Sequence, residues 1–181
     1  MFVFKEFQLD EMTIKLLLPE TSQARDLYRV VKEDRDTLKL WMPWANETHS
    51  QRSEAEFLKY IQGRMVDDKV FMLTIAVNDV AVGMVDLHNI DRANRHAEVG
   101  YWLSSQVQGH GIMTESLKRL IEYAFHEMGL HKILIQVDTE NDPSNAIPKR
   151  LGFKLEATFQ DQIYFHGQYR DFYEYGLINR E

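Results

Sequence analysis

The sequence predicts one domain of the α+β kind, residues 1–181, in which helices flank a mixed but mostly antiparallel sheet. Two β-branched runs, 70–77 and 80–87, are separated by Asn78-Asp79, a turn pair typical of a two-residue antiparallel hairpin. Further on, a strand-like segment leads through a glycine loop into residues 112–128, whose apolar side chains recur with helical spacing. A chain of 181 residues, 44% of them hydrophobic, is expected to fold around one core.

The first half of the chain alternates strand-like and helix-like segments. Residues 13–18 read as the first strand, and a helix follows them with Thr21 or Ser22 as its N-cap. Ser53 with Glu56 three residues later is a capping-box pattern, which predicts the start of a second helix. The apolar face of that helix is expected to hold Phe57, Leu58, Ile61 and Met65.

The second half is expected to hold two more strands, two helices and a long terminal hairpin. In order, these are a strand at 97–103, a helix at 112–128 ended by Gly129, a strand at 132–137, a helix at 144–151 and a hairpin over 154–178. The turn of the hairpin is predicted at His166-Gly167.

The loop before the helix at 112–128 reads Gln106-Val107-Gln108-Gly109-His110-Gly111-Ile112. Glycine has no Cβ, so the backbone there can adopt positive φ and approach a ligand closely. The first amides of the next helix have no intrahelical acceptor, and the helix dipole adds positive charge at the same place. The junction therefore predicts an anion site, with an ordinary turn as the alternative.

This loop fits the pattern Q/R-x-x-G-x-G/A of the pyrophosphate-binding loop in GNAT-superfamily acetyltransferases, which the chain resembles from about 13 to 180. The same superfamily has segments like Ala97-Glu98-Val99-Gly100-Tyr101-Trp102-Leu103 upstream, and like Asn141-Asp142-Pro143-Ser144 and Lys149-Arg150-Leu151-Gly152-Phe153 downstream. The chain looks most like the RimJ/RimL type, which acetylates N-termini of ribosomal proteins. The resemblance implies a GNAT fold, acetyl-CoA as co-substrate and a protein N-terminal amine as acceptor.

In the GNAT fold two strands splay apart, and the pantetheine arm of acetyl-CoA lies between them. The resemblance assigns these strands to 99–103 and 132–137, with backbone N–H groups near Trp102 or Leu103 polarising the thioester oxygen. The pyrophosphate would be held by the loop residues Gln108, Gly109, His110, Gly111, Ile112 and Met113. His110 could equally face water.

Acetyl transfer requires a neutral amine and a proton for the departing thiolate. By resemblance, Ser144 would donate to the coenzyme sulfur and Asn141 would contact the pantetheine arm. The alternatives are that Ser144 caps a helix and that Asn141 is a turn residue. Glu98 is the leading candidate for the base, although a strand carboxylate is often only solvated.

Some family members have a glutamate near the start of the last hairpin instead. The matching position here holds Ile163, which leaves the base open between Glu98, Asp161 and an ordered water. Trp41 and Trp44 could wall the acceptor site or pack in the core.

Composition limits the partners. A net charge of −7 without a long basic run argues against direct nucleic-acid binding. The chain has no cysteine, and its histidines lack metal-ligand spacing, so neither disulfides nor a metal is expected. No membrane span or signal peptide is recognisable, so we expect a cytoplasmic protein, and a homodimer is compatible with the sequence.

Two other functions fit the same residues. One is an acetyltransferase of the same fold acting on a polyamine, antibiotic or amino acid. The other is a protein that binds acyl-CoA as a sensor without turnover.

Overall fold

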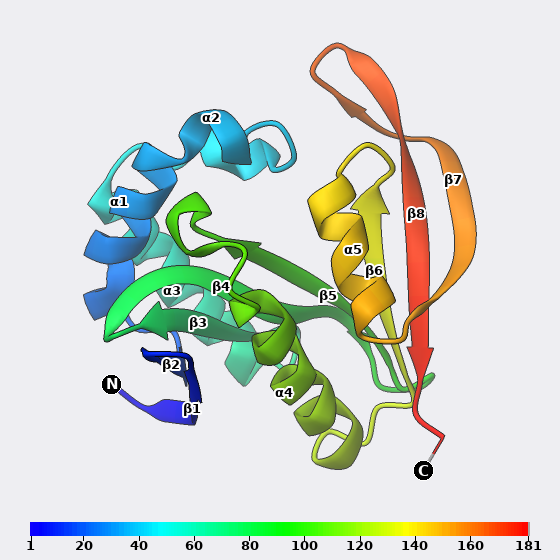
Figure 1. The fold of residues 1–181 in the computed structure, drawn as a ribbon, viewed down its shortest axis with the longest axis horizontal. Helices are drawn as coiled ribbons and strands as arrows, with labels where there is room; N and C mark the ends of the chain where they lie inside the picture. The colour runs from blue at the N-terminus through cyan, green and yellow to red at the C-terminus, as the bar shows by residue number, and fades with distance from the viewer. Residues whose placement is uncertain (181) are drawn as a thin grey trace.

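The computed structural model describes residues 1–180, which form one eight-stranded sheet in the order β1-β2-β3-β4-β5-β6-β8-β7 (Figure 1). All neighbouring strands are antiparallel except β5 and β6, which are parallel, so the predicted mixed and mostly antiparallel sheet is confirmed. The strands are β1 (Val3–Leu9), β2 (Met12–Leu17), β3 (Phe71–Val77), β4 (Val80–Asp91), β5 (His96–Leu103), β6 (Lys132–Asp138), β7 (Lys154–Phe165) and β8 (Gln168–Ile178).

Helices cover both faces of the sheet. Figure 1 shows α4 and α5 on the near face, with α3 behind β3 and β4. The helices are α1 (Ala24–Glu33), α2 (Arg35–Leu38), α3 (Gln51–Val66), α4 (Ile112–His126) and α5 (Asp142–Arg150), with 3-10 turns η1 (Thr21–Gln23), η2 (Pro43–Asn46) and η3 (Ser105–Val107). No helix within residues 1–180 is long and apolar enough to cross a membrane.

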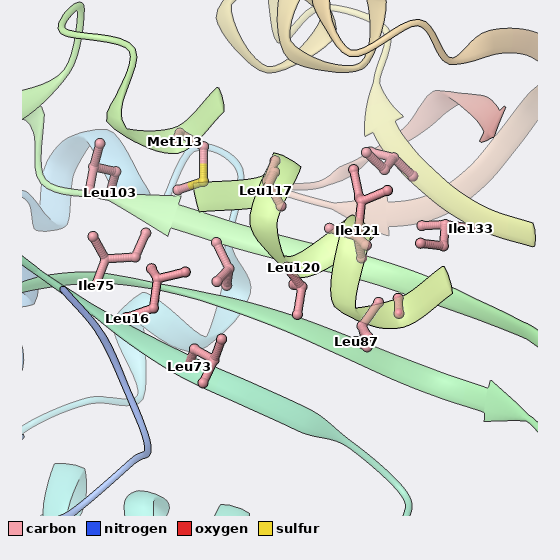
Figure 2. Packing of buried hydrophobic residues seen from close by; sticks show 14 of the residues in the cluster. Leu16, Leu73, Ile75, Leu87, Leu103, Met113, Leu117, Leu120, Ile121 and Ile133 are labelled. Atoms are coloured by element: carbon pink, nitrogen blue, oxygen red, sulfur yellow. The ribbon is translucent and has the colours of Figure 1, made fainter. Parts of the chain in front are cut away.

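The main core lies between α4 and the sheet. Leu117 and Leu120 of α4 are fully buried against Leu73, Ile75 and other strand residues, as Figure 2 shows. The predicted apolar face of α4 is confirmed, because the period of 3.6 residues places all its buried side chains on one stripe. A second cluster, with Leu27, Leu58 and Met84, packs α1 and α3 against the opposite face.

Both predicted hairpin turns are present. Asn78 and Asp79 have φ of 48° and 68° between β3 and β4. His166 and Gly167 have φ of 52° and 81° between β7 and β8. Asparagine, aspartate and glycine tolerate this left-handed region better than other residues, which is why the short local pattern was informative.

The strand at 13–18 is not the first one, because β1 precedes it and pairs with it at the edge of the sheet. Phe7 is the one buried residue of β1, so the segment lacks the burial alternation that identifies a strand from sequence.

The predicted helix starts were wrong at two places. Neither Thr21 nor Ser22 is a cap, because the side chains of Glu20 and Gln23 form the capping box of η1. The second helix begins at Gln51, where Ser50 Oγ accepts from the Ser53 N–H at 3.1 Å and Ser53 Oγ accepts from the Ser50 N–H at 3.0 Å. Two serines thus make the reciprocal bonds that we assigned to a serine and a glutamate.

Candidate active site

The parallel pair β5–β6 is held together over only three residue pairs. His96, Ala97 and Glu98 pair with Lys132, Ile133 and Leu134, and the ladder ends there. Beyond this point β5 continues with β4, and β6 continues with β8 as far as Asp138. Figure 1 shows the two strands diverging toward their C-terminal ends. The open edge of β5 is the splay that the sequence analysis expected.

The register decides which backbone groups face this open edge. Ser104 N–H donates to the Val82 carbonyl at 2.8 Å, which makes Val82 and Ser104 a hydrogen-bonded pair. Because such pairs alternate along an antiparallel ladder, Trp102 N–H faces Met84 on β4. The N–H groups of Tyr101 and Leu103 then point toward the β6 side. Of the two predicted donors, the geometry therefore favours Leu103.

The glycine loop adopts the conformation that its sequence predicts. Gly109 and Gly111 have φ of 84° and 77°, and Gly111 is the left-handed N-cap of α4. A Cβ at either glycine would meet nothing within 4 Å, so the loop surface is open to a ligand. The amides of Ile112, Met113 and Thr114 belong to the first turn of α4 and have no carbonyl partner among residues 1–180.

Two side-chain hydrogen bonds hold the segment between β5 and the glycine loop in place. Gln108 Nε2 donates to the Leu103 carbonyl at 2.9 Å, and Asp34 at the end of α1 accepts from the Ser105 N–H at 2.8 Å. His110 is exposed. The loop can thus present its amides without rearrangement, which is what an anion such as pyrophosphate requires.

Ser144 is not the cap of its helix. Asn141 is the N-cap of α5, and its Oδ1 accepts from the Ser144 N–H at 3.2 Å. The Ser144 hydroxyl lies 3.0 Å from Tyr101 Oη instead. Burial raises the pKa of Tyr101 to about 12, so its phenol stays protonated at neutral pH. This contact bridges β5 and α5 beside the open edge, and the sequence analysis did not single out Tyr101.

Glu98 lies at the closed end of the splay, in the last residue pair with β6. Its carboxylate accepts from Asn89 Nδ2 at 3.0 Å and lies 3.6 Å from His88 Nε2. Hydrogen bonding to Asp86 raises the pKa of His88, which favours the imidazolium between the two carboxylates. Glu98 is therefore already paired.

The other candidate base, Asp161, lies on the exposed strand β7. It has φ of 51° within an irregularity of the β7–β8 pairing, and its N–H donates to Asp171 at 2.9 Å. Ile163 is 41% exposed on the same strand. Within residues 1–180, no hydrogen bond joins Asp161 or Ile163 to Ser144.

A cavity of about 340 Å³ lies on the other face of the sheet, under α3. Trp44 and Trp102 line the cavity, with their ring centroids 5.5 Å apart. Trp41 does not line it. The remaining lining residues are Glu47, Thr48, Ser53, Glu54, Phe57, Met72, Met84 and Asp86. The cavity thus combines an apolar wall with three carboxylates.

In this sheet the parallel strands β5 and β6 splay apart, and β5 leads into a glycine loop at the N-terminus of α4. Together these features define an acetyl-CoA-dependent N-acetyltransferase. The family profile described as "Acetyltransferase (GNAT) domain" matches residues 14–154, and the chain belongs to this family. The resemblance stated from the sequence is confirmed, and family membership supports an enzyme rather than a sensor.

Similar proteins cover nearly the whole chain. YdaF of Bacillus subtilis (strain 168) is 32% identical over 173 residues, covering 95% of this chain and 93% of YdaF. The ribosomal-protein-serine acetyltransferase of Escherichia coli (strain K12) is 27% identical over 160 residues, covering 87% of this chain and 88% of that protein. A crystal structure of the microcin C7 self immunity acetyltransferase MccE in complex with acetyl-CoA and AMP has a TM-score of 0.87, 28% identity and 92% coverage of both chains.

We predict that Gly111→Val weakens acetyl-CoA binding by at least about tenfold, because a side chain at the loop surface blocks the approach of phosphates to the amides. Gly129→Val is the matched control, since Gly129 also has positive φ, at 66°, and open space around its Cβ, but lies at the far end of α4. Calorimetric titration of both variants separates the two effects. Equal losses of affinity in the two variants would mean that backbone strain, not the loop surface, is responsible.

We predict that Ser144→Ala lowers kcat about tenfold or more and changes acetyl-CoA affinity little, because a donor to the departing sulfur acts mainly in the transition state. Stability should change little, because the helix cap belongs to Asn141. Asn141→Ala should show the opposite, a loss of about 1 kcal/mol of stability. An unchanged kcat for Ser144→Ala would remove this residue from the chemistry.

Proposed function

We propose that this protein transfers the acetyl group of acetyl-CoA to the N-terminal α-amine of a protein, with ribosomal proteins as the first acceptors to test. The observation that carries the proposal is the open edge of β5, a strand that leads into the glycine loop and whose Trp102 lines the acidic cavity. The name of the Escherichia coli relative supports the choice of acceptor.

The residues that would hold acetyl-CoA lie along one path. The amides of Gly109 to Met113 would bind the pyrophosphate, Asn141 would contact the pantetheine arm, and the thioester would lie along the open edge of β5. There the N–H of Leu103 would donate to the thioester oxygen, where negative charge develops during attack. Ser144 would donate to the sulfur, and Tyr101 would hold the Ser144 hydroxyl in place.

The acceptor would approach from the opposite face of β5. An α-amine has a pKa of about 7.7–8.0, so a large fraction is neutral at physiological pH and little activation is required. Positioning the amine against the thioester can then supply much of the acceleration. Glu98 is retained as a candidate base that would act through a water, because its carboxylate is occupied by Asn89.

A small-molecule amine is the second candidate acceptor. MccE, an acetyltransferase whose structure contains AMP, shares the fold over most of its length. The net charge of −7 and the carboxylates of the cavity would also suit a polycation such as spermidine.

We predict that peptides with free N-termini are acetylated, and that the same peptides with blocked N-termini are not, even when they contain lysine. A lysine amine, with a pKa of about 10.4, is almost fully protonated at neutral pH. Mass spectrometry of the products identifies the modified amine. Efficient acetylation of the blocked peptides, or of spermidine alone, would contradict an α-amine acceptor.

A further inference from the structure

We propose that the cavity under α3 receives the acceptor amine and that Glu54 takes a proton from it. This inference deepens the proposed function and rests on it for the identity of the amine. Two residues that line the cavity already had expected roles, Trp44 in the wall of the acceptor site and Trp102 through its backbone N–H, but the sequence did not point to Glu54.

Glu54 is a buried carboxylate without a partner. The residue is 4% exposed and lines the cavity, and no hydrogen bond or ion pair joins its carboxylate to another group within residues 1–180. Buried polar groups are nearly always hydrogen-bonded, because leaving them unpaired costs free energy. A carboxylate kept in this state beside an open cavity points to a ligand that supplies the missing partner.

The start of α3 sets this position. The reciprocal bonds between Ser50 and Ser53 begin the helix at Gln51, which turns Glu54 and Leu58 inward and leaves Glu56 on the surface. Glu54 then lines the same cavity as Met72, Met84 and Trp44. Because Glu54 is only 4% exposed, its carboxylate is poorly solvated.

The other charged groups at this cavity are less available. Asp86 faces it from β4, but its Oδ1 is bonded to His88 at 2.7 Å, and His88 also contacts Glu98. Glu47 faces it from the turn after η2 and is exposed to solvent. Glu54 is therefore the carboxylate of the cavity best able to bind an ammonium group and accept its proton.

The cavity and the open edge of β5 are separated by the thickness of one strand. The Trp102 side chain stands in the cavity wall, and the N–H of the next residue, Leu103, faces the open edge. Gly100 of β5 leaves room for the Asp86 side chain, because a Cβ there would lie 2.7 Å from the Asp86 carboxylate. An amine held in the cavity is thus directed toward the thioester site.

Burial raises the pKa of Glu54 to about 7. This value is close to that of an α-amine, about 7.7–8.0, and far below that of lysine, about 10.4. Proton transfer from an α-ammonium to Glu54 is therefore nearly balanced, whereas transfer from a lysine is unfavourable. The same group that accepts the proton thus favours N-terminal amines.

Every proton that moves in the proposed reaction has a donor and an acceptor. Glu54 takes one proton from the ammonium, and the nitrogen lone pair then forms the C–N bond to the thioester carbon. The C–S bond breaks and its electron pair stays on sulfur. A second proton leaves the nitrogen and reaches sulfur through Ser144 or water, and Glu54 finally releases its proton to solvent.

The test measures kcat/KM against pH for wild type, Glu54→Gln and Glu54→Asp, with a free N-terminal peptide and with spermidine. The wild-type rate should rise through an inflection near pH 7. Glu54→Gln should lose this inflection and about 100-fold of the rate at pH 7, with acetyl-CoA affinity unchanged. Its rate should approach that of wild type above the pKa of the amine. Glu54→Asp should keep the inflection at a reduced rate.

Two further variants locate the effect. Glu56→Gln, on the exposed side of the same helix, should behave as wild type. Glu98→Gln should keep the inflection near pH 7. If the inflection disappears in Glu98→Gln and persists in Glu54→Gln, the inference is overturned.

Thermal unfolding of Glu54→Gln shows whether the variant is folded and reports the buried carboxyl directly. A raised pKa means that the unfolded chain gives up this proton at lower pH than the folded one, so stability falls as pH rises from the ordinary pKa of 4.5 to about 7, and the loss is complete above that pH. The melting temperature of Glu54→Gln relative to wild type should therefore be higher at pH 8.5 than at pH 5.5. An identical difference at both pH values would contradict the buried, partner-free carboxyl.

The choice of two acceptors separates this inference from the proposed function. If wild type acetylates spermidine but no peptide, the α-amine acceptor is wrong, and the Glu54 comparison is decided on spermidine. If Glu54→Gln has the wild-type pH profile with the acceptor that is turned over, Glu54 is not the proton acceptor.

Discussion

The early end of the β5–β6 ladder is the constraint on which the rest of the structure depends. β6 pairs with β8 along its whole length and β5 pairs with β4, so beyond Glu98 each strand follows its own half of the sheet. α4 packs on the β4–β5 half and α5 on β6, which covers the open edge from one face. Backbone polar groups without a ladder partner must be satisfied by water or a ligand. The fold therefore contains a binding edge that needs no side chain to create it.

In the proposed reaction, strand alternation assigns the coenzyme and the acceptor to opposite faces of β5. Tyr101 points toward α5 and contacts Ser144, while Trp102 points toward α3 and lines the cavity. The coenzyme and the acceptor can thus be recognised on opposite faces and meet at the backbone between them.

The sequence predicted well those features that depend on residues close together in the chain. The glycine loop, the turn at Asn78-Asp79 and the buried stripe of α4 follow from positive φ and helical periodicity within a few residues. The contact of Tyr101 with Ser144 joins residues 43 positions apart, and the burial of Glu54 depends on how α3 meets the sheet. Such features arise from tertiary packing, which a single sequence does not display. Edge strand β1 was missed because most of its side chains are exposed.

Residue-resolved amide hydrogen exchange at Tyr101, Trp102 and Leu103 tests most directly whether the open edge of β5 binds the coenzyme. Trp102 N–H faces β4 and should exchange slowly with or without ligand. The amides of Tyr101 and Leu103 should exchange faster than Trp102 in the free protein, and Leu103 should slow strongly when acetyl-CoA is added. Equal protection of all three amides without ligand, or no change at Leu103 under saturating acetyl-CoA, would contradict the account.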